Sequence, residues 1–505
     1  MAQWKSLGGG AALVALLGST AQAEVTAAEV WQSWKDLTTS MGQTLTVESE
    51  EMSGDTLTVT NMAMKSESVG VTATGTLASI AFEELGDGTV AVTMSPEYPV
   101  IITTKVEGED PVVVALTVRQ TDLRMIASGS VDALSYDVSA PELAIILDNV
   151  SGMPDGGAVD LTATFKGVAG KYTVASGEKK VVGTEFKADL LSVDVKVDDP
   201  TPETGGSGAF TVAIAALQSA SNATFAPETD FQDMPAALAA GFATDGTMTY
   251  GKTTFSFNFT DPTSNGKANG TIANGGFNFA LDAARMGYGS TTNGTDITVS
   301  SSDMPFPAVT ITLAEAAFNF LMPVMKSTEP QDFSMLTKLV GFSISDEIWG
   351  MIDPTAVLPH DPATVILDVA GKGNWLVDIM DQSLAEDTSG KVPGELHALT
   401  LKQLQVTAAG ADLSGTGDFT FDNTDTATIP GMPKPTGSID VKLVGGNGLL
   451  DKLVLMGVLP EDQSMGAKMM MGMFGRTVEG AEDTLTSQIE FKADGGIFAN
   501  GQQIQ

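Results

Sequence analysis

Apolar residues recur at every second position over long stretches of this chain, and this alternation constrains its fold more than any other feature. Because successive side chains of a β-strand point to opposite faces, a period of two places apolar residues on one face and polar residues on the other. Such stretches predict half-buried antiparallel strands. They include Leu57 to Met64 (LTVTNMAM), Val69 to Leu77 (VGVTATGTL), Val159 to Phe165 (VDLTATF), Leu191 to Val197 (LSVDVKV), Thr253 to Phe259 (TTFSFNF) and Ile439 to Leu443 (IDVKL).

Glycine-containing steps separate many of these stretches. Asn-Gly and Asp-Gly pairs tolerate the positive φ angles of tight hairpin turns, so the sequence predicts a long meander of strands. The predicted turns are Gly86-Asp87-Gly88, Asn265-Gly266, Asn269-Gly270, Asn274-Gly275 and Asn293-Gly294.

Helices are predicted at a few places within this pattern. Glu24 to Met41 shows apolar spacing of three and four, which is typical of an amphipathic helix. Further helices are predicted at 231–242, 313–326, 333–339, 449–456 and 462–474.

The resulting fold class is mainly β (α+β), with elongated antiparallel sheets and several packed helices. The segment 198–208 (DDPTPETGGSG) has the composition of a linker or exposed loop. It divides the expected mature chain into a β-rich unit with a leading helix at 24–200 and a second β-rich unit with helices at 209–505.

The first 23 residues have the features of a cleavable export signal. Lys5 is the only positive charge, Leu7 to Leu17 is a short apolar stretch, and Ala21 to Ala23 (AQA) forms a cleavage site. The apolar stretch is shorter than the roughly 20 residues that span a bilayer, although a retained anchor is the alternative. No later stretch is long and apolar enough to predict a transmembrane helix. We therefore expect a periplasmic protein of a bacterial envelope.

The chain has no cysteine among its 505 residues, which excludes disulfides, thiolate metal sites and a cysteine nucleophile. Its formal net charge is −37, which becomes −38 when the signal and its single lysine are removed. A surface this acidic repels phosphate backbones, so nucleic acid is not an expected partner. The charge favours solubility, with a specific cation-binding role as the alternative.

The C-terminal third resembles a known family. Leu399 to Phe421 (LTLKQLQVTAAGADLSGTGDFTF), Gly437 to Leu450 (GSIDVKLVGGNGLL) and Phe491 to Gln502 (FKADGGIFANGQ) are similar to the alphaproteobacterial exported family called domain of unknown function 2125. That resemblance implies an exported protein without an assigned activity, and it contributes no site residues. The repeated succession of a strand, a glycine and another strand also resembles the AsmA-like envelope proteins. This resemblance implies a protein that handles lipids in an elongated groove.

No motif of the sequence predicts a catalytic residue, a metal site or a cofactor. Gly246 to Thr253 (GTMTYGKT) matches a nucleotide-binding loop, but a predicted strand follows it where a helix is required. Asp261 begins a segment like a calcium loop, yet the twelfth position is Ile272 where a glutamate should stand. His360 and His397 lack the spacing of a zinc site.

A methionine-rich segment supplies the only candidate site residues. Met465, Met469 and Met473 follow each other at intervals of four, on one face of a predicted helix. Such a stripe is typical of core packing, and the alternatives are an apolar groove for a ligand or partner and a copper(I) site. We name these three methionines as candidate groove residues.

The leading functional hypothesis is a non-enzymatic periplasmic protein that binds an apolar ligand such as a lipid, or an envelope protein. Long half-buried sheets with a few helices can enclose a hydrophobic groove. One alternative is a cell-wall glycan hydrolase, which needs two carboxylates about 5–10 Å apart in a cleft. Another is a purely structural or assembly protein.

Overall fold

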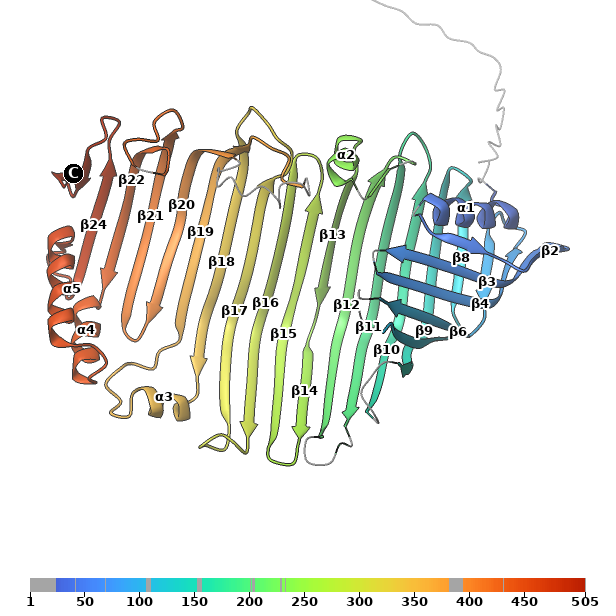
Figure 1. Cartoon of the computed structure of the whole chain (residues 1–505), viewed down its shortest axis with the longest axis horizontal. Helices are drawn as coiled ribbons and strands as arrows, with labels where there is room; N and C mark the ends of the chain where they lie inside the picture. Colours follow the sequence, from blue (N-terminus) through green and yellow to red (C-terminus); the bar gives the residue numbers. More distant parts are fainter. Residues whose placement is uncertain are drawn as a thin grey trace, which may run out of the picture.

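The chain folds into one antiparallel sheet of 26 strands (Figure 1). The computed structural model describes residues 24–504 except 41, 69, 106–109, 152–156, 200, 202–204, 228, 232, 381–393 and 430. The predicted export signal lies outside the described residues. The expected mainly β fold is confirmed, with 63% strand and 11% helix, so the helices are too few to cover a sheet of this size.

The first part of the sheet consists mostly of short strands that follow one helix. These elements are α1 (Ala27–Ser40), β1 (Thr44–Thr46), β2 (Ser49–Ser53), β3 (Thr56–Ser68), β4 (Val71–Glu84), β5 (Val90–Met94), β6 (Glu97–Thr104), β7 (Val112–Thr121), β8 (Arg124–Ser130) and β9 (Ala133–Val150). β5 and β6 lie end to end against β4, and β7 and β8 lie end to end against β9.

The rest of the sheet is a meander of longer strands, as the sequence predicts. The strands are β10 (Ala158–Ala175), β11 (Lys180–Asp198), β12 (Ser207–Phe225), β13 (Ala243–Tyr250), β14 (Thr253–Thr260), β15 (Asn265–Leu281), β16 (Arg285–Ser301), β17 (Val309–Pro323), β18 (Gln331–Ile344), β19 (Ala363–Trp375), β20 (Gly394–Ala408), β21 (Ala411–Asp422), β22 (Lys434–Val444), β23 (Arg476–Thr477), β24 (Thr484–Phe491), β25 (Ile497–Ala499) and β26 (Gln502–Gln503). The helices are α2 (Met234–Ala239), α3 (Asp346–Ile352), α4 (Gly446–Leu455) and α5 (Glu461–Phe474).

The alternation of side chains slips by one residue along a line that crosses the long strands. In β17 the large apolar residues before the slip are the odd-numbered Val309, Ile311 and Leu313, and those after it are chiefly the even-numbered Phe318, Phe320 and Met322. Left-handed residues mark this line in alternate strands: Gly167 (φ 61), Ala216 (φ 51), Gly294 (φ 61) and Gly341 (φ 67). Irregularities of this kind bend a strand and increase its twist.

The slip keeps the apolar side chains on one face of the sheet. Phe165 of β10 lies on one side of the slip line, where it pairs with Leu191 of β11. Phe186 of β11 lies on the other side of the line, where it pairs with Gly170 of β10. Their rings nevertheless meet edge to face with centroids 5.8 Å apart. The two halves of each long strand therefore present their apolar residues in the same direction.

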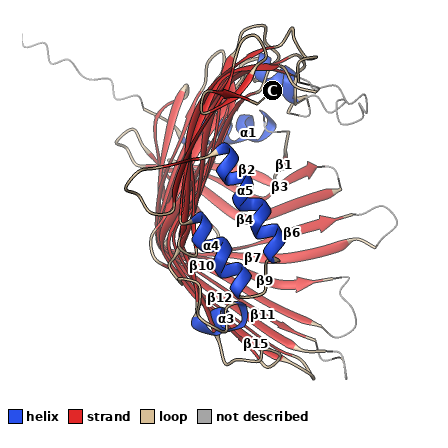
Figure 2. Ribbon diagram, turned by 90° about the vertical axis from the view of Figure 1, so that its left-hand side faces the viewer, coloured by secondary structure: helices blue, strands red, loops and turns tan. Residues whose placement is uncertain are grey.

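The sheet is curved, and the helices α1, α4 and α5 lie on its concave side (Figure 2). α1 lies at the N-terminal end of the row of strands and α4 and α5 at the C-terminal end (Figure 1). α2 and α3 lie near the two rims, where strands end (Figure 1). No helix of the described residues thus covers the middle of the concave face.

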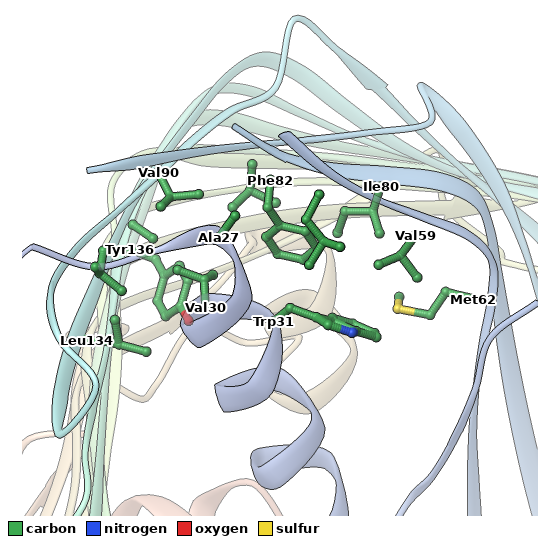
Figure 3. Close-up of a cluster of buried hydrophobic side chains, with 14 residues drawn as sticks. Ala27, Val30, Trp31, Val59, Met62, Ile80, Phe82, Val90, Leu134 and Tyr136 are labelled. Atoms are coloured by element: carbon green, nitrogen blue, oxygen red, sulfur yellow. The ribbon is translucent and has the colours of Figure 1, made fainter. Parts of the chain in front are cut away.

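The main hydrophobic core surrounds α1 (Figure 3). Val30 and Trp31 are almost fully buried against Ile80 and Phe82 of β4. The ring of Trp31 lies 5.7 Å from that of Phe82, and Trp34 lies 6.4 Å from Tyr136 of β9. The predicted leading helix is confirmed, and it fills the N-terminal end of the concave face.

Two predicted helices are wrong. The segments 313–326 and 333–339 belong mainly to the strands β17 and β18. The one-residue slip at Ala314 places Leu313 and Ala316 three residues apart, and this spacing imitates a helix within a strand. The helices predicted around 231–242, 449–456 and 462–474 are present as α2, α4 and α5.

The four Asn-Gly turns are also wrong, because all four pairs lie within β15 and β16. The turn at Gly86-Asp87-Gly88 is present between β4 and β5. The predicted linker at 198–208 falls between β11 and β12, which pair from Asp198↔Ser207 to Lys180↔Phe225, so the sheet continues across it.

Candidate functional site

The two faces of the long sheet differ sharply in chemistry. Residues that pair directly across neighbouring strands share a face, so the register traces continuous rows across the sheet. One row consists of Tyr136, Tyr172, Thr184, Ser221, Gly246, Phe279, Tyr288, Phe320, Met335, Val369, Leu401, Gly417, Ile439 and Ile489. This row begins beside α1 and carries no charged residue, so it belongs to the concave face.

A second row lies on the other side of the slip line and has the same character. It consists of Tyr98, Val118, Ile145, Ala163, Val193, Val212, Phe255, Gly270, Ile297, Ile311 and Ile344. On the convex face, the adjacent row consists of Asp137, Lys171, Glu185, Ala220, Thr247, Asn278, Gly289 and Asn319.

Charge is confined to the convex face in the central part of the sheet. In the strands β12 to β22, every described Asp, Glu, Lys and Arg takes a convex position by alternation and register. Lys338 and Glu315, for example, form an ion pair of 2.7 Å on that face. In these central strands the concave face of this acidic protein is therefore uncharged and largely apolar.

Glycines beneath aromatic rings shape the floor of the concave face. An added Cβ would lie 2.2 Å from the Phe255 ring at Gly270 and 2.3 Å from the Phe259 ring at Gly266. Such rings lie over the glycine of the neighbouring strand and shield its backbone from water. This packing explains why three Asn-Gly pairs occur inside β15, because the glycine lies beneath the ring and the asparagine faces the convex side. The fourth pair differs, because Gly294 has a φ of 61° at the slip line and lies beneath no ring.

An aromatic cluster lies near the middle of the concave face. The ring centroids of Tyr288, Phe318 and Phe320 lie 6.0–6.4 Å apart, within the range of favourable aromatic pairs. A cavity of about 390 Å³ adjoins this cluster and is lined chiefly by apolar side chains. It includes Phe320, Met322, Phe333, Trp375 and Leu396. Its size falls in the range of small-molecule sites.

The concave face remains accessible along most of its length. Phe257 is 42% exposed, Phe318 38%, Leu339 43% and Val365 40%. Soluble monomers rarely expose contiguous apolar patches larger than a few hundred Å², and larger patches mark sites of interaction. The residues of this face together form the candidate binding site.

The methionines named as candidates do not face the sheet. Met465, Met469 and Met473 are 61%, 70% and 61% exposed. The prediction that these three side chains pack in the core is therefore wrong. The opposite side of α5 contributes Met471 and Phe474 to a cavity of about 150 Å³ at the C-terminal end of the concave face. The sequence pattern located the helix correctly but pointed to its outer side.

Comparisons with known proteins assign no family to this arrangement. No family model, no curated protein and no solved structure matches the chain. The resemblance to domain of unknown function 2125 and to AsmA-like proteins therefore stays a prediction. Within the described ranges, no helix has the length and apolar character needed to cross a bilayer.

The other motifs of the sequence serve local structure. The nucleotide-loop match, 246–253, spans the junction of β13 and β14. The carboxylate of Asp261 accepts hydrogen bonds from the hydroxyl group of Ser264 and from the backbone N–H groups of Thr263 and Ser264 in a turn, and these bonds lower its pKa. His360 stacks on Trp349 at 4.3 Å. In the described part of the chain, no three His, Asp or Glu side chains are grouped in a way that could hold a metal ion.

Two carboxylates on the convex face line one hollow together. Asp137 and Glu185 border a shallow hollow of about 480 Å³, with Lys171 on the strand between them. All three side chains are exposed. A glycan hydrolase keeps one of its two carboxyl groups in an apolar environment, whereas both of these carboxylates lie on an exposed polar surface.

Proposed function

We propose that this protein binds the acyl chains of lipids along its concave face, as a non-enzymatic protein of the periplasm. One observation carries the proposal: among the described residues, a largely apolar face without charged side chains runs across β12 to β22, and no helix covers it. An acyl chain needs such a surface because it offers no hydrogen bonds and gains free energy from leaving water. The absence of cysteine and the signal-like first 23 residues support the location.

The dimensions of this face suit a lipid better than a small ligand. Neighbouring strands lie about 4.8 Å apart, so the row from Tyr136 to Ile489 extends over roughly 60 Å. That length exceeds the roughly 30 Å hydrocarbon core of a bilayer. More than one acyl chain therefore fits along the face, with polar headgroups directed toward the rims.

Native mass spectrometry of the protein isolated from its own cells tests this proposal. The wild type is expected to carry lipid masses under gentle conditions. Phe320→Asp adds a negative charge in the central cavity and should lose lipid. Asn319→Asp adds the same charge at the next position, on the convex face, and should keep it.

A clean apo mass for the wild type would overturn the proposal. So would equal lipid loss in both variants, because binding would then not depend on the concave face. Unfolding curves of both variants must first show that each is folded, since Phe320 packs in the aromatic cluster.

A further inference from the structure

The hairpin formed by α4 and α5 exposes an unusual number of apolar side chains. Leu455 is 75% exposed and Val458 64%, and both lie where α4 ends. The three methionines Met465, Met469 and Met473 continue this apolar surface along α5 with 61–70% of each side chain exposed. We call these five residues the outer stripe. Exposing this much apolar surface in water is unfavourable unless something covers it.

The three methionines of the outer stripe lie on α5, which also packs on the C-terminal end of the concave face. Met471 and Phe474 face the sheet and line a cavity together with Leu413 and Leu485. A residue two positions away on a helix points in a nearly opposite direction, so Met469 and Met473 point away from Met471. α5 therefore separates the C-terminal end of the concave face from whatever covers the stripe.

Charge distinguishes this hairpin from the rest of the molecule. The segment 446–474, from the first residue of α4 to the last residue of α5, contains three acidic residues (Asp451, Glu461 and Asp462) and two basic residues (Lys452 and Lys468), so its formal charge is −1. The whole chain carries −37. The hairpin is thus a nearly neutral region through which this acidic protein can approach a membrane without strong repulsion.

The residue types of the stripe favour lipid over a protein partner. Protein interfaces concentrate their binding energy in Trp, Tyr and Arg, and the stripe has none of these. Methionine, leucine and valine insert readily among acyl chains, and flexible methionine adapts to a fluid surface.

We propose that the α4–α5 hairpin docks on an uncharged or zwitterionic lipid bilayer by inserting the outer stripe. Docking places the C-terminal end of the concave face close to the membrane, with α5 between the two. This inference rests on the proposed lipid binding and deepens it by naming a membrane contact.

The absence of native cysteine allows a direct test, because one introduced cysteine labels a single position. An environment-sensitive dye on Met469→Cys should shift to an apolar signal when phosphatidylcholine vesicles are added. The same dye on Val131→Cys, which is 52% exposed between β8 and β9, should not shift.

Flotation of the unlabelled protein with the same vesicles gives an independent readout. The triple variant Met465→Gln, Met469→Gln and Met473→Gln should bind vesicles at least about tenfold more weakly, since each substitution removes apolar surface without adding charge. A matched control replaces three exposed apolar residues elsewhere (Met52→Gln, Val131→Gln and Val181→Gln) and should bind like the wild type.

The outcomes separate this inference from the proposed function. The stripe variant should keep the lipid that the protein carries, because the concave face is unchanged. Wild-type protein that does not float, or a stripe variant that floats equally well, would overturn the docking inference alone. A dimer that the stripe variant loses, without vesicle binding by the wild type, would also overturn it and assign the stripe to a second copy of the chain.

Discussion

Two valines of matched exposure on opposite faces offer a quantitative test of the concave face. Val365 of β19 is 40% exposed on the concave face, and Val181 of β11 is 42% exposed on the convex face. Val365→Asp and Val181→Asp make the same change in charge and volume. Only Val365→Asp places the new carboxylate where an acyl chain should lie.

The expected loss follows from the exposed fraction. Full burial of a valine side chain is worth about 1.5–3 kcal/mol, so covering the exposed 40% of Val365 contributes about 1 kcal/mol to binding. Covering an unpaired polar group costs at least about 2 kcal/mol more. The sum of about 3 kcal/mol corresponds to roughly a hundredfold weaker binding.

Fluorescence titration with a labelled fatty acid measures this difference directly. Val365→Asp should bind about a hundredfold more weakly, whereas Val181→Asp should match the wild type. Urea unfolding of both variants controls for stability, which the two half-exposed positions should affect similarly. Equal affinities in the two variants would refute the assignment of binding to the concave face.

Three further predictions concern the stability of the sheet. Ala216→Gly should raise the free energy of unfolding by about 0.5–1 kcal/mol in urea melts, because Ala216 has a φ of 51° that glycine adopts without strain; a decrease would contradict this. Gly270→Ala should lower it by about 1–3 kcal/mol because the new Cβ would lie 2.2 Å from the Phe255 ring, while Gly466→Ala, with no atom within 4 Å, should not lower it; equal effects would exclude the ring contact as the cause. Burial raises the pKa of Tyr172 to about 12, so its contribution to stability is complete below pH 10 and is lost as the pH rises through 12; Tyr172→Phe should flatten stability over this range in unfolding curves at stepped pH, and an unchanged pH dependence would refute it.

The period-two alternation was sufficient to predict a meander of antiparallel strands, because it reports directly on which face each residue takes. It failed where the alternation slips, as at Leu313 and Ala316 in β17. A single strand cannot reveal that its slip is matched in the neighbouring strands. The mainly β fold was therefore predictable, and the exact extent of β17 and β18 was not.

The sequence predicted that the candidate site is an apolar groove, but it did not predict which residues line it. Asn269-Gly270 has the composition of a turn, and only the position of Phe255 on the next strand shows why the glycine belongs in the sheet. Similarly, helical spacing groups Met465, Met469 and Met473 but cannot say which side of α5 meets the sheet. Both predictions failed because contacts between segments far apart in the sequence decide whether Asn269-Gly270 lies in a strand and which side of α5 meets the sheet.

Cross-linking with a photoactivatable phospholipid tests most directly whether lipid lies on the concave face. Peptide mass spectrometry after irradiation locates each cross-link to a residue, and alternate residues of one strand report on opposite faces. We predict cross-links to concave residues such as Phe257, Phe318 and Leu339. Equal or greater labelling of the nearby convex residues Ser256, Asn319 and Lys338 would contradict lipid binding on the concave face.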